Sequence, residues 1–333
     1  MEGGLSARID RRRLVTFAAA LLVPSTILKQ IVPASAQSLG DWVTRAPLPV
    51  HTAGLHASVL DGKIYVMGGD RSTGSTGNAV TGSTQIYDPI TNSWTEAAPM
   101  PTARGFLATA AIGGRIFAVG GSINMFEQDP GIGTLEIYDP KTDSWSRGAD
   151  MPTPRADLTG SEVNGKLYAI GGTRHVGIEA LPVVEEYDPD ADTWTRKADM
   201  PTARLHLSSA VVDGNIIVIG GGPEWPVPLP TTESYDPATD SWMQLADMPT
   251  PRIGCWAAAL HGKAYVMGGV SWENEALRVV EEFDPKADSW HRVADMVGAR
   301  MLFAAEAVGG KVYAIGGTST DFTTLASVEA FAP

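Results

Sequence analysis

A six-fold internal repeat constrains this chain more than any other feature of its sequence. Six times, a short run rich in β-branched and aromatic residues is followed by a Gly-Gly pair, at 68–69, 120–121, 171–172, 220–221, 268–269 and 316–317. An aromatic residue follows each pair, as Tyr-Asp-Pro at 87–89, 138–140, 187–189 and 235–237, then as Phe283 and Phe331. Self-similarity with a period near 50 residues predicts a repeat protein built from one supersecondary unit.

The pattern within one repeat predicts four short β-strands, which we name A to D in chain order. In the second repeat, strand A is expected at about 105–112, strand B at 115–119, strand C at 134–138 and strand D at 144–149. Gly-Gly and Asp-Pro dipeptides supply the turns. With Gly-Gly, Tyr-Asp-Pro and Trp in register, the chain from about residue 41 to 333 resembles the Kelch-repeat family. The resemblance implies an all-β, six-bladed Kelch β-propeller with four antiparallel strands per blade.

The two ends of the repeat array predict how the ring closes. The last repeat stops after strand C at Phe331, whereas the array begins with an unpartnered strand D from Asp41 to Ala46. We therefore expect the N-terminal strand to complete the last blade of a single domain, residues 37–333. Closure removes the open sheet edges at which β proteins aggregate.

Charge and cysteine content exclude several classes of function. The chain has 25 basic and 38 acidic residues, so its formal net charge of −13 argues against nucleic-acid binding. A single cysteine, Cys255, rules out an intrachain disulfide and a Cys-rich zinc site.

The first 36 residues have the pattern of a targeting segment. Arginines at 11–13 precede an apolar stretch from Leu14 to Leu28, and Ala34-Ser35-Ala36 then offers an A-x-A cleavage site. Arg-Arg-x-Leu-Val resembles the twin-arginine export pattern. We expect a signal peptide at 1–36, cleavage before Gln37, no stable membrane span afterwards, and export to the periplasm or cell surface. An uncleaved membrane anchor is the alternative.

Only one segment of the repeat varies in length. The gap from the second glycine of each Gly-Gly pair to the aromatic residue of strand C falls from 18 to 14 residues along the chain, while the other spacings are constant. Length variation on one face of a repeat protein usually marks its binding face. We therefore place the functional surface on the loops between strands B and C, named the B–C loops, and on the neighbouring starts of strand A.

Recurring charged residues have a structural interpretation. Five repeats begin strand A with Arg and carry Glu two positions before the aromatic residue of strand C: Arg104 and Glu136, Arg155 and Glu185, Arg204 and Glu233, Arg252 and Glu281, Arg300 and Glu329. The first repeat has Thr52 and Gln85 instead, so both charges are missing together. Because loss of one member of a buried pair leaves the other charge unpaired, we expect an Arg–Glu pair inside each of five blades.

Three tryptophans lie outside the repeat pattern and gather on two adjacent blades. Trp225 and Trp272 belong to the B–C loops of blades 4 and 5, and Trp256 lies early in strand A of blade 5; Glu224 and Glu273 accompany them. Aromatic rings beside carboxylates suit stacking on a sugar or anchoring of a partner loop, and packing between the two blades is the alternative. Further ligand contacts on the same face are expected from Arg71, Phe106, Phe126, Asp157 and His206.

Candidates for catalysis are few. Glu162 and Glu306 occupy inner strands where other blades mostly carry Ala, Ser or Val, so each either faces a water-filled channel or has a raised pKa. Arg174 and His175 form the only other acid–base grouping. Sugar chemistry at these residues would resemble that of the periplasmic six-bladed Kelch sialic acid mutarotases, whose catalytic pair does not map onto identifiable positions here.

Metal and radical chemistry lack suitable residues. Galactose oxidase, the best-known exported Kelch enzyme, needs free tyrosines and a Cys–Tyr link, but all eight tyrosines here belong to repeat positions. Cys255 falls in an apolar position of strand A, and the six histidines show no short ligand spacing. The sequence thus predicts no metal and no cofactor, and it excludes galactose oxidase chemistry.

Three functional hypotheses remain. The leading one is an exported, non-catalytic binding module that presents its B–C loops to a protein or glycan. The second is a carbohydrate-active enzyme such as a sialic acid mutarotase or epimerase, and the third is an assembly scaffold with a broad apolar patch. Convergence of the candidate catalytic side chains on one concave pocket would distinguish the second from the first.

Overall fold

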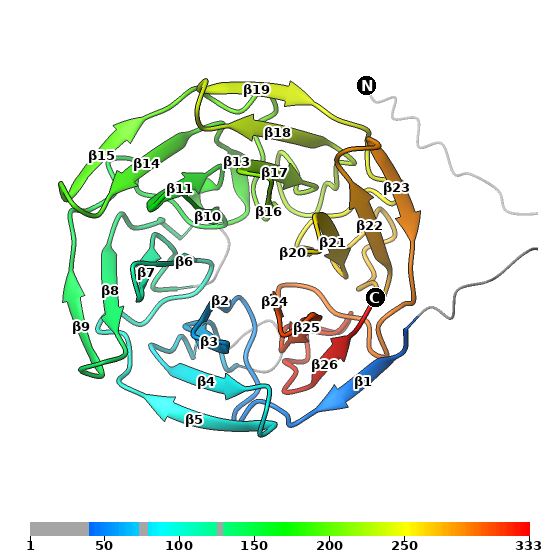
Figure 1. The fold of residues 1–333 in the computed structure, drawn as a ribbon, viewed down its shortest axis with the longest axis horizontal. Coiled ribbons are helices and arrows are strands. Elements are labelled where there is room, and N and C mark those ends of the chain that lie inside the picture. The colour runs from blue at the N-terminus through cyan, green and yellow to red at the C-terminus, as the bar shows by residue number, and fades with distance from the viewer. Residues whose placement is uncertain (1–39, 73–78, 125–128) are drawn as a thin grey trace, which may run out of the picture. The chain divides into compact units, whose positions relative to one another are not determined.

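Six four-stranded antiparallel sheets are arranged as blades around a common centre (Figure 1). The computed structural model describes residues 40–72, 79–124 and 129–333. Strand A of each blade is innermost and strand D outermost. The described residues contain no α-helix, and hence no helix long and apolar enough to cross a membrane. The predicted all-β, six-bladed propeller is confirmed.

The first three blades follow the chain in order. Blade 1 comprises β2 (His56–Leu60), β3 (Lys63–Met67), β4 (Thr84–Asp88) and β5 (Ser93–Ala97). Blade 2 comprises β6 (Ala108–Ile112), β7 (Arg115–Val119), β8 (Leu135–Asp139) and β9 (Ser144–Arg147). Blade 3 comprises β10 (Thr159–Val163), β11 (Lys166–Ile170), β14 (Val184–Asp188) and β15 (Thr193–Arg196), and its B–C loop adds a hairpin of β12 (Thr173–His175) and β13 (Ile178–Ala180).

The last three blades complete the ring. Blade 4 comprises β16 (Ser208–Val212), β17 (Asn215–Ile219), β18 (Thr232–Asp236) and β19 (Ser241–Gln244). Blade 5 comprises β20 (Trp256–Leu260), β21 (Lys263–Met267), β22 (Val280–Asp284) and β23 (Ser289–Arg292). Blade 6 comprises β24 (Ala304–Val308), β25 (Lys311–Ile315), β26 (Val328–Phe331) and β1 (Trp42–Arg45).

The N-terminal strand closes the ring, as the sequence predicts. β1 pairs antiparallel with β26, with Trp42 opposite Phe331 and Arg45 opposite Val328. In Figure 1 the blue β1 lies along the outside of the red β26. The indole of Trp42 stacks on Phe331 with ring centroids 5.3 Å apart.

The inner strands begin later than the sequence pattern predicts. Strand A of blade 2 starts at Ala108 and not at 105, because Phe106 has a φ of 54°. A residue in the left-handed region cannot continue a β-strand. Gly105 forms only an isolated bridge with Ser122.

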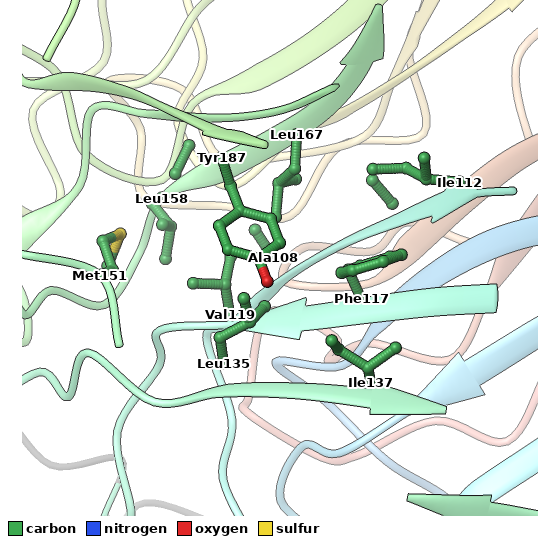
Figure 2. Packing of buried hydrophobic residues seen from close by; sticks show 12 residues of the cluster. Ala108, Ile112, Phe117, Val119, Leu135, Ile137, Met151, Leu158, Leu167 and Tyr187 are labelled. Atoms are coloured by element: carbon green, nitrogen blue, oxygen red, sulfur yellow. The ribbon is translucent and has the colours of Figure 1, made fainter. Parts of the chain in front are cut away.

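The hydrophobic core lies between neighbouring blades. Between blades 2 and 3, Phe117 and Leu135 pack with Leu167 and Tyr187, and all four side chains are buried (Figure 2). Successive strand residues point to opposite faces, so each blade contributes to the clusters on both of its sides. Cys255 is fully buried in the corresponding cluster between blades 4 and 5.

The six repeat tryptophans connect each blade to the one before it. Every indole N–H donates to an alanine carbonyl of the preceding blade at 2.8–3.0 Å, in the pairs Trp42–Ala294, Trp94–Ala46, Trp145–Ala98, Trp194–Ala149, Trp242–Ala198 and Trp290–Ala246. These tryptophans therefore hold the ring together at its rim.

The five Arg–Glu pairs are ion pairs inside single blades. All five arginines are fully buried, and each guanidinium contacts the glutamate on strand C of its own blade. In blade 4, Nη2 of Arg204 donates to Oε2 of Glu233 at 2.6 Å. The other carboxylate oxygen, Oε1, accepts a hydrogen bond from the hydroxyl group of Thr202. Blade 1 has no such pair: buried Thr52 donates to the Val50 carbonyl instead.

Candidate binding face and channel

A closed ring of backbone hydrogen bonds lies at the centre of the B–C loop face. Each blade contributes the residue two positions before its strand A, namely Gly54, Phe106, Asp157, His206, Gly254 and Leu302. All six have left-handed φ values between 47° and 65°. The amide of each donates to the carbonyl of its counterpart in the preceding blade, at N···O distances of 2.8–3.1 Å. We name these six residues the central ring.

Side chains of the central ring close the mouth of the channel. The rings of Phe106 and Trp225 approach His206 edge-on, with centroid distances of 5.1 and 5.2 Å. The void beneath, bounded by Leu302 and Trp256 among others, is about 30 Å³, which suits one or two water molecules. A ligand on this face must therefore rest on the loops and not in a central pocket.

Asp157 and His206 support the face from inside. The two side chains are almost completely buried, with His206 Nδ1 lying 3.5 Å from Asp157 Oδ1. Asp157 Oδ2 accepts the amide N–H of Gly177 at 3.1 Å, which fixes the tip of the β12–β13 hairpin. Burial raises the pKa of Asp157 and lowers the pKa of His206. The sequence analysis places both residues among surface contacts, but their side chains are enclosed.

Trp225 packs between blades. Its indole contacts His206 and covers Gly254, where a Cβ atom would lie 3.3 Å from the ring. Its amide donates to the Gly177 carbonyl, which ties the blade 4 loop to the blade 3 hairpin. The neighbouring Glu224 is exposed. Trp225 therefore packs between blades, which is the alternative to ligand contact given above for the three tryptophans.

Trp256 lines the channel and does not join Trp272 on the surface. Its ring meets that of His56 edge-on, with centroids 4.7 Å apart. Trp256 lines both the small void under the central ring and a larger cavity beyond it. The indole therefore separates the two.

Two aromatic side chains do project into solvent. Trp272, which is 65% exposed, and Phe322, which is 39% exposed, lie on the B–C loops of blades 5 and 6. The amide of Ala276 donates to the hydroxyl of Thr320, so the two loops are directly joined. The sequence analysis overlooks Phe322, although an aromatic residue between Asp321 and Thr323 in a loop with no repeat counterpart is a usable signal.

Exposed carboxylates surround these rings. Glu273 and Glu275 flank the Trp272 loop, and Asp321 precedes Phe322. We name Trp272, Phe322 and these three acidic residues the acidic aromatic patch.

The remaining loop candidates are dispersed. Arg174 and His175 are exposed on β12, and this hairpin bonds the neighbouring loops through the Arg174 carbonyl and the Ala180 amide. Arg71 is partly buried, and its Nε has no hydrogen-bond partner among the described residues. Phe126 lies outside the described residues.

A cavity of about 260 Å³ runs along the channel and is lined by all six inner strands. Glu162 and Glu306 both line it. The carboxylate of Glu162 accepts the amide N–H of Gly165 in the A–B turn at 2.7 Å. Burial raises the pKa of Glu306 to about 8, so its carboxyl group is protonated at neutral pH. Glu306 thus lines the channel and also has a raised pKa.

The four catalytic candidates do not share a pocket. Arg174 and His175 lie on the B–C loop face, whereas Glu162 and Glu306 lie in the cavity beyond the central ring. The part of the chain that the structure describes has no group of three or more His, Cys, Asp or Glu placed to hold a metal ion. The four candidates are therefore divided between two separate parts of the molecule.

Comparison with known proteins gives a consistent family assignment. A family model of the Kelch motif matches five segments, at 51–101, 103–152, 154–201, 203–249 and 251–297. Kelch-like protein terF of Aspergillus terreus is 31% identical over 138 residues, which cover 40% of this chain and 30% of the relative. Kelch repeat and BTB domain-containing protein 13 of Homo sapiens is 34% identical over 129 residues, which cover 38% of this chain and 27% of the relative. The chain thus spans less than a third of either relative.

Among solved structures, one titled "Structure of YjhT" superposes with a TM-score of 0.73 at 15% identity. The match covers 85% of this chain and 95% of that chain. At this identity the likeness establishes a shared fold.

Proposed function

The chain belongs to the Kelch-repeat family, and from that premise we propose that it is a binding module whose acidic aromatic patch docks a protein partner. Trp272 carries the proposal, because its large apolar side chain is 65% exposed on a loop of the binding face. Kelch propellers serve as protein-interaction modules, and loops on one rigid face are where such scaffolds place their contacts.

Three exposed apolar side chains belong to the adjacent loops and the connection of blades 5 and 6. Besides Trp272 and Phe322, Val297 in the connection between these blades is 62% exposed. Tryptophan is enriched among the residues that dominate the free energy of protein association. A partner that covers this arc would remove three apolar side chains from water.

The charge around the patch indicates the chemistry of the partner. Glu273, Glu275 and Asp321 are exposed, and the whole chain carries a net charge of −13. Complementary charge accelerates association and disfavours wrong partners. We therefore infer a partner segment with apolar side chains flanked by Lys or Arg.

The test is affinity capture followed by measurement with the purified partner. Residues 37–333 are immobilised, captured proteins are identified by mass spectrometry, and the affinity of the purified partner is measured for wild type, Trp272→Ala and Ile90→Ala. We expect Trp272→Ala to weaken binding at least tenfold, since loss of a central tryptophan costs about 2 kcal/mol or more.

The control change, Ile90→Ala, removes a 94% exposed apolar side chain from a C–D turn and should leave the affinity unchanged. Equal affinities for wild type and Trp272→Ala would overturn the proposal. A thermal-shift panel of neutral sugars, amino sugars and sialic acid runs in parallel, and a shift that Trp272→Ala abolishes would replace the protein partner with a glycan.

We also propose that residues 1–36 direct export of the propeller. The supporting observation is the arginine cluster, apolar stretch and A-x-A site described above. Expression of the full chain in a bacterium with a twin-arginine pathway should yield a periplasmic product whose N-terminus, read by mass spectrometry, is Gln37. Replacing Arg11 and Arg12 with lysine should retain the chain in the cytoplasm; a product of full length in the periplasm would contradict cleavage.

A further inference from the structure

The channel cavity is lined by two carboxyl groups and, among the described residues, by no strongly basic side chain. The described residues that line it include the carboxyl groups of Glu162 and Glu306 but no lysine or arginine. Five hydroxyl-bearing residues also line it, and all five bond within two small clusters centred on Thr109 and Ser209. A lining with two carboxyl groups and no strongly basic side chain disfavours an anion and favours a cation.

His56 supplies a second, independent acceptor. It is 4% exposed and lines the cavity, and its Nε2 has no hydrogen-bond partner among the described residues. Its Nδ1 lies 3.1 Å from the carbonyl oxygen of Ala57 and 2.9 Å from the Thr109 hydroxyl, so Nδ1 carries the proton. Burial lowers the pKa of His56 to about 4, which leaves the ring neutral and Nε2 a bare acceptor.

Three of these features belong to consecutive inner strands. Trp256 on β20 and His56 on β2 are the first residues of the strands on either side of β24, and their rings touch. Glu306 lies two residues beyond the start of β24, which is about 7 Å along the strand. Trp256, His56 and Glu306 thus line the same sector of the cavity.

We propose that this cavity binds a small organic ammonium ion, whose charged group pairs with the carboxylate of Glu306 and whose apolar part packs on Trp256 and the alanines of the inner strands. Indole rings attract cations. A volume of about 260 Å³ is close to the lower limit of small-molecule sites.

Binding must be coupled to proton release. An ammonium ion pairs with an ionised carboxylate, whereas Glu306 has a pKa of about 8 in the empty cavity. The titratable groups on the neighbouring elements are His56 on β2, Lys63 and Tyr65 on β3, Lys311 and Tyr313 on β25, and Glu162 across the cavity. Neutral His56 and the tyrosines keep their protonation between pH 6 and 9, so Glu306 sets the pH dependence.

Isothermal titration calorimetry with butylammonium chloride tests the proposal, with 1-butanol as the uncharged analogue. We expect one ion per chain, with affinity at pH 9 at least tenfold higher than at pH 6, because the carboxyl group of Glu306 has a raised pKa. At pH 7, titrations in buffers of different ionisation enthalpy should show release of about half a proton or more per ion bound.

Glu306→Gln should abolish proton release and weaken butylammonium binding at pH 9 at least tenfold. The same chemical change at the exposed Glu275 should alter neither quantity. Because glutamine resembles the protonated carboxyl group, Glu306→Gln should fold, which near-ultraviolet circular dichroism will verify. Absence of binding at pH 9, equal binding of 1-butanol, or unchanged binding by Glu306→Gln would each overturn the proposal and leave a cavity that holds water alone.

Discussion

Replacing Arg204 with alanine is expected to lower the free energy of unfolding by about 3–5 kcal/mol. Arg204 is fully buried, and its guanidinium bonds Glu233 together with the carbonyl oxygens of Gly220 and Thr231. Without it, Glu233 keeps a negative charge in an interior that has no other cation for it, and the two carbonyl groups lose a donor. Urea unfolding, monitored by tryptophan fluorescence, measures the change.

Blade 1 shows that a blade can form without the Arg–Glu pair when both charges are absent together. It carries Thr52 and Gln85 where blade 4 carries Arg204 and Glu233, and it retains the same four strands. The double variant Arg204→Thr/Glu233→Gln should therefore be more stable than Arg204→Ala by about 2 kcal/mol, since no unpaired charge remains.

An exposed arginine provides the matched control. Arg196 pairs with Asp199 at the rim, and both side chains are about half exposed. Arg196→Ala should cost less than about 1 kcal/mol, because surface ion pairs contribute little. Equal effects of the two alanine variants would show that the buried pair has no special role.

Removal of residues 37–47 is also expected to lower the stability of the propeller by a large amount. β1 supplies the outer strand of blade 6, and Trp42 both stacks on Phe331 and donates to the Ala294 carbonyl at 2.8 Å. Loss of a buried tryptophan alone costs about 3–5 kcal/mol, and the truncated chain would also expose the edge of β26. We expect a lower melting temperature and concentration-dependent association, measured by calorimetry and light scattering.

Two point variants distinguish the loss of ring closure by β1 from the loss of any tryptophan side chain. Trp42→Ala should reproduce most of the loss, whereas Trp272→Ala, at an exposed position, should change stability by less than about 0.5 kcal/mol. Addition of a peptide spanning residues 37–47 should restore the melting temperature of the truncated chain. An unchanged melting temperature after truncation would refute closure by β1.

The repeat made the architecture predictable. Constant spacings, Gly-Gly pairs and aromatic residues specify strand order, blade number and the closing strand, since each repeat contacts only its neighbours. The paired absence of Arg and Glu in the first repeat was likewise sufficient to predict ion pairs within blades.

The site was harder to predict because it depends on departures from the repeat. No residue type signals the left-handed conformation of Phe106, His206 and Leu302, which follows from ring closure and not from local preference. The direction of the Trp256 side chain depends on the space left by small residues in neighbouring strands, which a single repeat does not reveal. Phe322 belongs to the shortest class of B–C loop, so loop length does not mark it.

The central ring has a topological consequence. Six amides and six carbonyls joined head to tail around a circle leave no terminal donor or acceptor. At the rim, β1 pairs with β26 and closes the outer circle. The propeller is thus closed at two radii at once, so opening it at any one blade interface would break hydrogen bonds both at the hub and between neighbouring blades at the rim.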